Sequence, residues 1–139
     1  MAGRLQSLSA ENFRSIRGPI SVSLDAPVVL IHGPNGTGKT SMLSAIELAL
    51  TGGVPSLARS AADYLAHLPH KLSPDGKASV AIVAEGIVDA GPGKVVADGV
   101  GLTPGALLNK DMARFYTERC YLGQSTLARL LEIYEYQDT

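Results

Sequence analysis

The stretch “VVLIHGPNGTGKTSMLSAIELALTG”, residues 28–52, contains an apolar run, a glycine-rich loop and a helical pattern in that order. Its middle part, “GPNGTGKT” at 33–40, has the spacing G-x-x-x-x-G-K-[ST] of a phosphate-binding loop. The run “VVLIH” at 28–32 is typical of a strand buried on both faces, as in a parallel sheet. Apolar side chains then recur at helical spacing over 39–51. Strand, loop and helix are the context that the motif requires, so the stretch predicts a nucleotide site.

The residue types of the loop match the chemistry of phosphate binding. Glycines allow backbone N–H groups to turn inward, because no Cβ stands in the way. Those donors and the positive end of the following helix favour phosphate oxygens. Lys39 would place a cation against the same oxygens, and Thr40 would offer a hydroxyl to Mg²⁺. We therefore expect ATP and Mg²⁺ as ligands.

Length and composition favour one globular domain. The chain has 139 residues, a formal net charge of −1 and 45% hydrophobic residues. A single cysteine, Cys120, excludes an internal disulfide and suits a reducing cytoplasm; a small core side chain is favoured over a reactive thiol. The sequence has no apolar segment long enough to span a membrane and no apolar signal core at its start. The weak net charge argues against a nucleic-acid-binding surface over the whole chain, although a local basic patch stays open.

The rest of the chain predicts two hairpins and further helices. Residues 4–16 have strand-like content and lead to an expected turn at Arg17-Gly18-Pro19, after which “ISVSL” alternates as a half-buried strand. Residues 78–88 and 94–100 form a second expected hairpin around “AGPG”. We expect the helix after the loop to end at Gly52-Gly53, a short helix over 57–68 capped by Ser56, a loop over 101–111, and a helix from Thr126.

A nucleotide hydrolase also needs a carboxylate at the end of a second apolar strand. Glu85 and Asp98 follow apolar strands, but no two acidic residues adjoin anywhere in the chain. The short turn between their strands implies antiparallel pairing, whereas a metal-binding strand of a doubly wound sheet is reached by a helical crossover. Similarly, “LTGG” at 50–53 resembles a transporter-type signature but is better explained as a glycine helix cap. The catalytic carboxylate is therefore not identified in this chain.

Three separated motifs together resemble a known family. “NFRSIRG” at 12–18, the loop stretch at 28–52 and “CYLGQSTLARLLEIY” at 120–134 resemble the first half of an SMC-like ATPase head. The resemblance is closest to the double-strand-break repair ATPases of the bacterial SbcC type, and it extends over residues 1–139. It implies an α/β P-loop NTPase fold of the ABC/SMC type: an N-terminal lobe with a phosphate-loop sheet and an antiparallel β layer. The phosphate loop would span 33–41, the glutamine loop would lie near 124, and 126–139 would lead to a coiled coil.

The resemblance also implies roles for individual residues. The phosphate cradle would consist of Asn35, Gly36, Thr37, Gly38, Lys39, Thr40 and Ser41. Lys39 and Gln124 would be catalytic, Thr40 and Gln124 would hold Mg²⁺, and Arg14 would lie near the nucleotide phosphates. The segment around His70-Lys71-Leu72 matches a nucleotide-contacting segment more loosely.

Plainer interpretations of the same residues stay open. Gln124 also fits the polar start of a helix, and Arg14 also fits a solvated hairpin edge. His67 and His70 with Asp63 have metal-ligand chemistry, but an exposed helix face is favoured. The apolar face over 127–134 would pack on a missing lobe or begin the coiled coil.

The resemblance implies an ATP hydrolase that works only with a C-terminal lobe, in the same or a separate chain, which supplies the signature motif and the Asp-Glu strand. Two heads would engage around ATP and separate on hydrolysis, and DNA and a nuclease subunit would be partners. Repair, DNA processing, chromosome organisation and defence all fit, in the cytoplasm or at the nucleoid. The alternatives are a stand-alone nucleotide-dependent phosphotransferase that uses Glu85 or Asp98, and a non-catalytic nucleotide-sensing assembly module.

Overall fold

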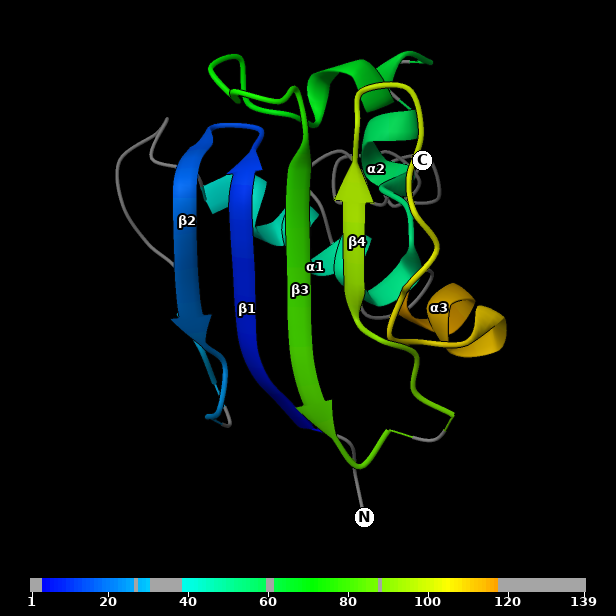
Figure 1. Ribbon diagram of the computed structural model, residues 1–139. Coiled ribbons are helices and arrows are strands. Elements are labelled where there is room, and N and C mark those ends of the chain that lie inside the picture. Colours follow the sequence, from blue (N-terminus) through cyan, green and yellow to red (C-terminus); the bar gives the residue numbers. More distant parts are fainter. Residues whose placement is uncertain (1–3, 27, 31–38, 60–61, 88, 118–139) are drawn as a thin grey trace, which may run out of the picture.

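The computed structural model describes residues 4–26, 28–30, 39–59, 62–87 and 89–117. The described chain forms one four-stranded sheet with the strand order β2-β1-β3-β4, and all three neighbouring pairs are antiparallel (Figure 1). The strands are β1 (Arg4–Phe13), β2 (Ile16–Ser23), β3 (Ala78–Glu85) and β4 (Lys94–Ala97). The helical elements are α1 (Lys39–Thr51), α2 (Pro55–Ala58), the 3-10 helix η1 (Tyr64–His67) and α3 (Lys110–Phe115). Both predicted hairpins are therefore present.

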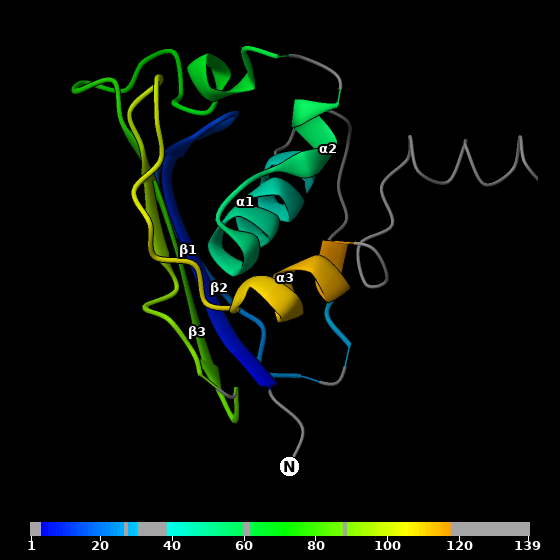
Figure 2. The same ribbon diagram turned by 90° about the vertical axis from the view of Figure 1, so that its right-hand side faces the viewer.

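The sheet has one covered and one uncovered face. Helices α1, α2 and α3 lie on the same side of it (Figure 2). Successive side chains of a strand point to opposite faces, so each strand contributes alternate apolar residues to the covered side. On β1, Leu8 and Ala10 are buried, while Ser9 between them and Glu11 after them are exposed. The core thus lies between the sheet and α1, and short polar side chains occupy much of the other face.

Helix α1 lies in the middle of the covered side and has the predicted bounds. Its inner face carries small and apolar residues such as Ala45, Leu48 and Ala49, all buried. The helix ends at Thr51, and the next residue, Gly52, has a left-handed φ of 81° and donates its N–H to the Leu48 carbonyl at 2.8 Å. A glycine adopts this conformation without a Cβ penalty, which confirms that “LTGG” is a helix cap. Among the described helices, none is long and apolar enough to cross a membrane.

The first hairpin turns earlier than predicted. The turn lies at residues 14–15, while Arg17, Gly18 and Pro19 belong to β2. Proline is tolerated there because β2 is an edge strand of the described sheet and has no described partner on its outer side. Asn12 adopts a φ of 51° and its Oδ1 accepts the Gly18 N–H at 2.8 Å, so an asparagine side chain closes the tight turn.

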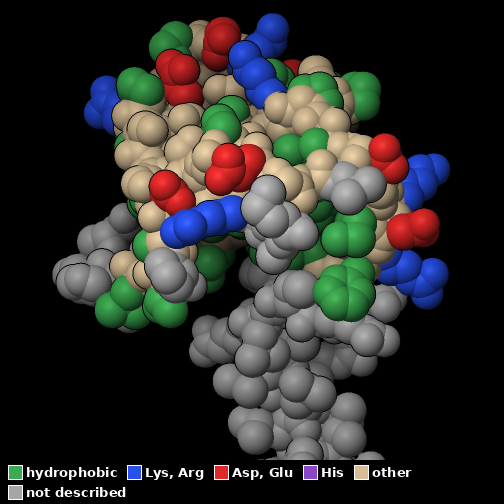
Figure 3. Space-filling model, turned by 90° about the horizontal axis from the view of Figure 1, so that it is seen from below, with side chains coloured by type: hydrophobic (Ala, Val, Ile, Leu, Met, Phe, Trp, Pro, Cys, Tyr) green, Lys and Arg blue, Asp and Glu red, His purple; other side chains and the backbone are tan. Residues whose placement is uncertain are grey.

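The predicted buried strand at 28–32 is wrong for its described part. Val28–Leu30 belong to no strand, and Val28 and Leu30 are 82% and 79% exposed. The view from below shows hydrophobic side chains at the surface of this end of the molecule (Figure 3). A strand buried on both faces requires flanking strands and covering layers, and the four described strands do not supply them here.

Smaller differences concern the helices. Instead of one helix over 57–68 capped by Ser56, the chain forms α2 and η1; α2 begins at Pro55 and its N-cap is Val54. Proline fits the first helical turn, where its missing N–H has no intrahelical role. Helix α3 was not predicted; the Asn109 side chain caps it by accepting the Met112 N–H at 2.9 Å. The expected helix from Thr126 and the core position of Cys120 lie outside the described residues.

Candidate functional site

A cavity of about 820 Å³ opens at the end of the sheet where β1 turns into β2. Three separate parts of the chain line most of it. The β1–β2 turn contributes Arg14 and Ser15, and the first turn of α1 contributes Lys39 and Thr40. The segment after η1 contributes residues 69–71. This cavity is large enough for a small-molecule ligand of nucleotide size.

The predicted phosphate-binding residues that the structure describes meet at this cavity. Lys39, Thr40 and Ser41 line it together with Arg14, which is 25 residues away in the sequence from Lys39. The predicted cradle residues Asn35, Gly36, Thr37 and Gly38 lie outside the described residues, as does Gln124. The start of the phosphate-loop helix and the arginine of “NFRS” are thus adjacent, although no local pattern predicts how close they lie.

Arg14 is held at both ends. Its φ of 52° is left-handed, and its backbone N–H donates to the Leu68 carbonyl at 2.6 Å. Its Nη1 donates to Ser44 Oγ on α1 at 2.8 Å. A guanidinium has five N–H donors, so the bond to Ser44 leaves donors that can reach anionic oxygens in the cavity.

Ser41 also contacts the β1–β2 turn. Its Oγ lies 2.7 Å from Ser15 Oγ and accepts the Ser15 N–H at 3.3 Å. Ser41 is buried, so these bonds satisfy a hydroxyl that has little access to water. The side chain of Ser41 therefore joins the turn to α1, and a contribution of Ser41 to phosphate binding would come from its backbone.

The third wall of the cavity is attached to the same turn. The His70 N–H donates to the Asn12 carbonyl at 2.7 Å, and Phe13 forms a β-bridge with Pro69. The Leu72 N–H donates to His70 Nδ1 at 3.0 Å, so neutral His70 carries its proton on Nε2. His70 and Lys71 thereby join Arg14 and Lys39 around one cavity, consistent with the looser expectation for this segment.

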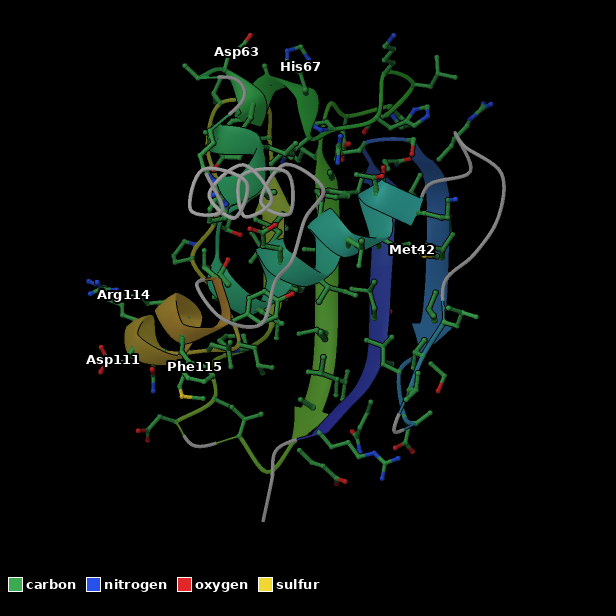
Figure 4. The ribbon with its side chains drawn as sticks, turned by 180° about the vertical axis from the view of Figure 1, so that it is seen from behind. Met42, Asp63, His67, Asp111, Arg114 and Phe115 are labelled. Atoms are coloured by element: carbon green, nitrogen blue, oxygen red, sulfur yellow. The ribbon has the colours of Figure 1, made fainter. Side chains whose placement is uncertain are left out.

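Charge at the cavity favours a polyanion. Lysine and arginine side chains line it, and its described lining includes no aspartate or glutamate. Asp63 and His67 form an exposed pair at η1, with His67 Nε2 3.4 Å from Asp63 Oδ2 (Figure 4), and His67 also lines the cavity. For these residues the sequence favoured an exposed helix face over a metal site. Among the described residues, no group of three metal-ligating side chains converges.

The two candidate carboxylates do not reach the cavity. Glu85 pairs in register with Arg4, at the opposite end of β1 from the turn. Asp98 lies beside a cavity residue, Gly99, but its Oδ1 accepts the N–H groups of Val100 and Gly101 at 3.0 and 2.8 Å. These backbone hydrogen bonds, of which the one from Val100 has the largest effect, hold the pKa of Asp98 below its usual 3.8. The phosphotransferase alternative expects Glu85 or Asp98 to hold Mg²⁺, and for Glu85 this expectation is therefore wrong. Asp98 instead caps its own turn.

The arrangement fits a nucleoside triphosphate and Mg²⁺. Lys39 and Arg14 supply positive charge from two separate parts of the chain, and Thr40 lines the same cavity. Sequence reasoning missed Ser15, Ser44 and Leu68, whereas His70 was included in a looser expectation. Ser15 was visible inside the “NFRS” motif, whereas nothing in the sequence linked Ser44 or Leu68 to Arg14.

Comparisons with known proteins give the family. The model of an AAA domain family matches residues 7–115, and the chain belongs to this family. Over 49 residues it is 47% identical to the DNA replication and repair protein RecF of Deinococcus deserti, covering 35% of this chain and 13% of RecF. Over 46 residues it is 37% identical to the chromosome partition protein Smc of Halothermothrix orenii, covering 33% and 4% of the two chains. The chain thus matches a small part of each relative's length.

A solved structure confirms the fold. One chain from work on the ATP-driven dimerization and DNA-stimulated activation of SMC ATPases superposes with a TM-score of 0.65 at 18% identity. The match covers 92% of this chain and 90% of that one. The predicted class, an α/β P-loop NTPase lobe of the SMC-type head, is therefore confirmed.

Proposed function

We propose that this chain is the ATP-binding lobe of an SMC-like ATPase that acts on DNA. The observation that carries the proposal is the convergence of Lys39, Thr40 and Arg14 on one cationic cavity. The “GPNGTGKT” loop immediately precedes Lys39 in the sequence, where it would supply backbone donors for phosphate oxygens. Thr40 and Gln124 would hold Mg²⁺, which would neutralise charge on the phosphates, and Gln124 would also approach the attacking water.

The proposal includes a complementary C-terminal lobe, in the same or a separate chain. Two observations support it. No aspartate or glutamate is among the described residues that line the cavity, so a carboxylate for Mg²⁺ and water has to come from elsewhere. In addition, Val28–Leu30 expose strand-forming side chains that would be buried if neighbouring strands were added. In this scheme ATP binding engages two heads and hydrolysis separates them.

The nature of the ATPase is proposed from its relatives. RecF is named for DNA replication and repair, and Smc for chromosome partition. We extend from them a DNA-bound role in the cytoplasm, in repair, processing, chromosome organisation or defence. The SbcC-type assignment, with a coiled coil after 126–139 and a nuclease subunit, belongs to this proposal on the strength of the “NFRS” and “YLGQ” motifs.

The first test is ATP binding by the 139-residue chain, measured by calorimetry with Mg²⁺ present. We expect weak binding that Lys39→Ala abolishes, because the lysine cation lies against the phosphates. Lys110→Ala is the matched control, since Lys110 begins α3 and does not line the cavity. No detectable binding by the wild-type chain would contradict the proposal.

The second test is turnover. The chain alone should hydrolyse almost no ATP and should gain activity when the complementary lobe is added, because that lobe would carry the carboxylate. Robust hydrolysis by the chain alone would contradict the two-lobe proposal and favour the phosphotransferase. ATP binding without turnover in the presence of the second lobe would instead favour a nucleotide sensor.

A further inference from the structure

We infer that Ser44 is a positioning residue that holds the Arg14 guanidinium at the nucleotide phosphates. Ser44 lies on α1, beyond the phosphate-binding motif, and the motif gives it no role. The inference rests on the proposed function, because it assigns Arg14 to a phosphate group. It adds a residue and a physical cause for the placement of Arg14.

The contact is specific and shielded from water. Ser44 is buried, and its Oγ accepts a hydrogen bond from Arg14 Nη1 at 2.8 Å. A hydrogen bond to a charged donor is among the stronger ones in proteins. The contact joins residues that are 30 positions apart, so it fixes the β1–β2 turn against α1 rather than stabilising the helix locally.

Ser41 and Ser44 act on the same turn. They lie three positions apart in the sequence, which places both on one face of α1. Ser41 holds the Ser15 hydroxyl and Ser44 holds the Arg14 guanidinium. The Arg14 backbone is fixed as well, by its bond to the Leu68 carbonyl. Arg14 is therefore anchored at its backbone and at its charged end, and this face of α1 is the support.

The consequence is preorganisation of the cation. A free arginine side chain has many rotamers, and ordering them when a ligand binds weakens affinity. The bond to Ser44 restricts these rotamers before ATP arrives. Because serine is neutral, it positions the guanidinium without neutralising the charge that the phosphates need. A lysine on the same turn could not be oriented in this way, because it lacks the planar fork of donors.

The test is a double-mutant cycle on ATP affinity with Ser44→Ala, Arg14→Ala and the double variant, measured by calorimetry on the full chain. We expect Ser44→Ala to weaken ATP binding by roughly five- to tenfold, the size associated with having to immobilise one rotamer-rich side chain on binding. Arg14→Ala should weaken it at least as much. In the Arg14→Ala background, Ser44→Ala should have less than about a twofold effect, because a positioning residue acts through the residue it positions.

Thr51→Ala is the matched control. Thr51 lies at the other end of α1 and does not line the cavity. Its hydroxyl also makes partly buried hydrogen bonds, to the Glu47 and Gly53 carbonyls. It should lower stability without a specific loss of ATP affinity. Urea unfolding of every variant shows whether the fold is kept. Ser44→Cys, of similar volume but a poor acceptor, replaces Ser44→Ala if the alanine variant does not fold.

The outcomes separate the two proposals. Unchanged ATP affinity in Ser44→Ala, or an equal loss with and without Arg14, would overturn the positioning role while ATP binding by the wild type stands. A wild-type chain that binds no ATP would contradict the proposed function and the inference with it. A loss that appears with ATP, is much smaller with AMP and disappears without Arg14 would establish the positioning role.

Discussion

Two apolar stretches of similar composition have opposite environments in this molecule. In β3, Val80 and Ile82 are 1% and 3% exposed, whereas Val28 and Leu30 are 82% and 79% exposed. Both stretches are rich in residues that favour strands. The difference is that β3 lies between β1 and β4 and faces α1, while Val28–Leu30 join none of the four described strands.

This comparison shows that strand propensity alone does not bury a segment. A strand becomes part of a core when neighbours satisfy its backbone and a layer covers its side chains. For β3, the neighbouring strands β1 and β4 satisfy the backbone, and helix α1 covers the side chains. Exposed apolar surface of the kind found at Val28–Leu30 commonly marks an interaction site, which agrees with the proposed second lobe.

The largest expected effect comes from cutting into the buried stretch. Ile82→Ala should lower the free energy of unfolding by about 2–5 kcal/mol, because it removes buried methyl groups and leaves a cavity. Leu30→Ala is the matched change in the exposed stretch and should stay within about 0.5 kcal/mol of the wild type. Urea unfolding of both variants measures the contrast. Equal destabilisation would show that residue 30 is buried in solution.

The next effect tests what the exposed stretch is for. Leu30→Lys should weaken association with the complementary lobe by roughly ten- to a hundredfold, since a buried leucine contributes about 1.5–3 kcal/mol. The stability of the isolated chain should hardly change. Val83→Lys is the control, because Val83 is also exposed but lies on β3. Binding can be followed by calorimetry, and equal losses for both variants would refute a specific role of residue 30.

A third change tests the close approach between β3 and Gly93, the residue immediately before β4. Gly93 has a φ of 70°, and a Cβ placed there would lie 2.5 Å from the Ile82 carbonyl oxygen. Gly93→Ala should therefore cost about 1–3 kcal/mol of stability, since backbone has to shift.

Gly76 provides the control for Gly93. Its φ of 69° is nearly the same, but a Cβ would meet nothing within 4 Å, so Gly76→Ala should show the conformational cost alone, about 1–2 kcal/mol. Thermal unfolding separates the two. If Gly76→Ala were the more damaging change, the close approach of β4 to β3 would not be what secures the buried stretch.

The smallest effect concerns the turn that follows β4. Backbone N–H groups lower the pKa of Asp98 below 3.8, so the ionised carboxylate stabilises the fold above that pH. The contribution should disappear as pH falls through the lowered folded-state pKa. The stability difference between the wild type and Asp98→Asn should thus be larger at pH 7 than at pH 3, measured by urea unfolding. A difference independent of pH would contradict this assignment.

The family resemblance implied the fold class, and strand alternation and turn residues, which are local signals, predicted both hairpins. The sequence also predicted the bounds of α1, since helical spacing and the glycine cap lie within one continuous stretch. It placed the first turn wrongly at residues 17–19, because Gly18 and Pro19 are usual turn residues and the edge position of β2 was not visible. The tight turn instead depends on the Asn12 side chain.

For the site, the order and spacing of the phosphate-loop motif predicted Lys39 and Thr40 as ligands, and the family resemblance implied Arg14; these roles stay predictions. The tertiary structure decided that Arg14 meets α1 through Ser44, that the 68–70 segment is attached to the same turn, and that Glu85 lies at the far end of the sheet. It also decided that Val28–Leu30 stay exposed. Burial and contacts between distant residues depend on which strands and helices become neighbours, and no local pattern encodes that.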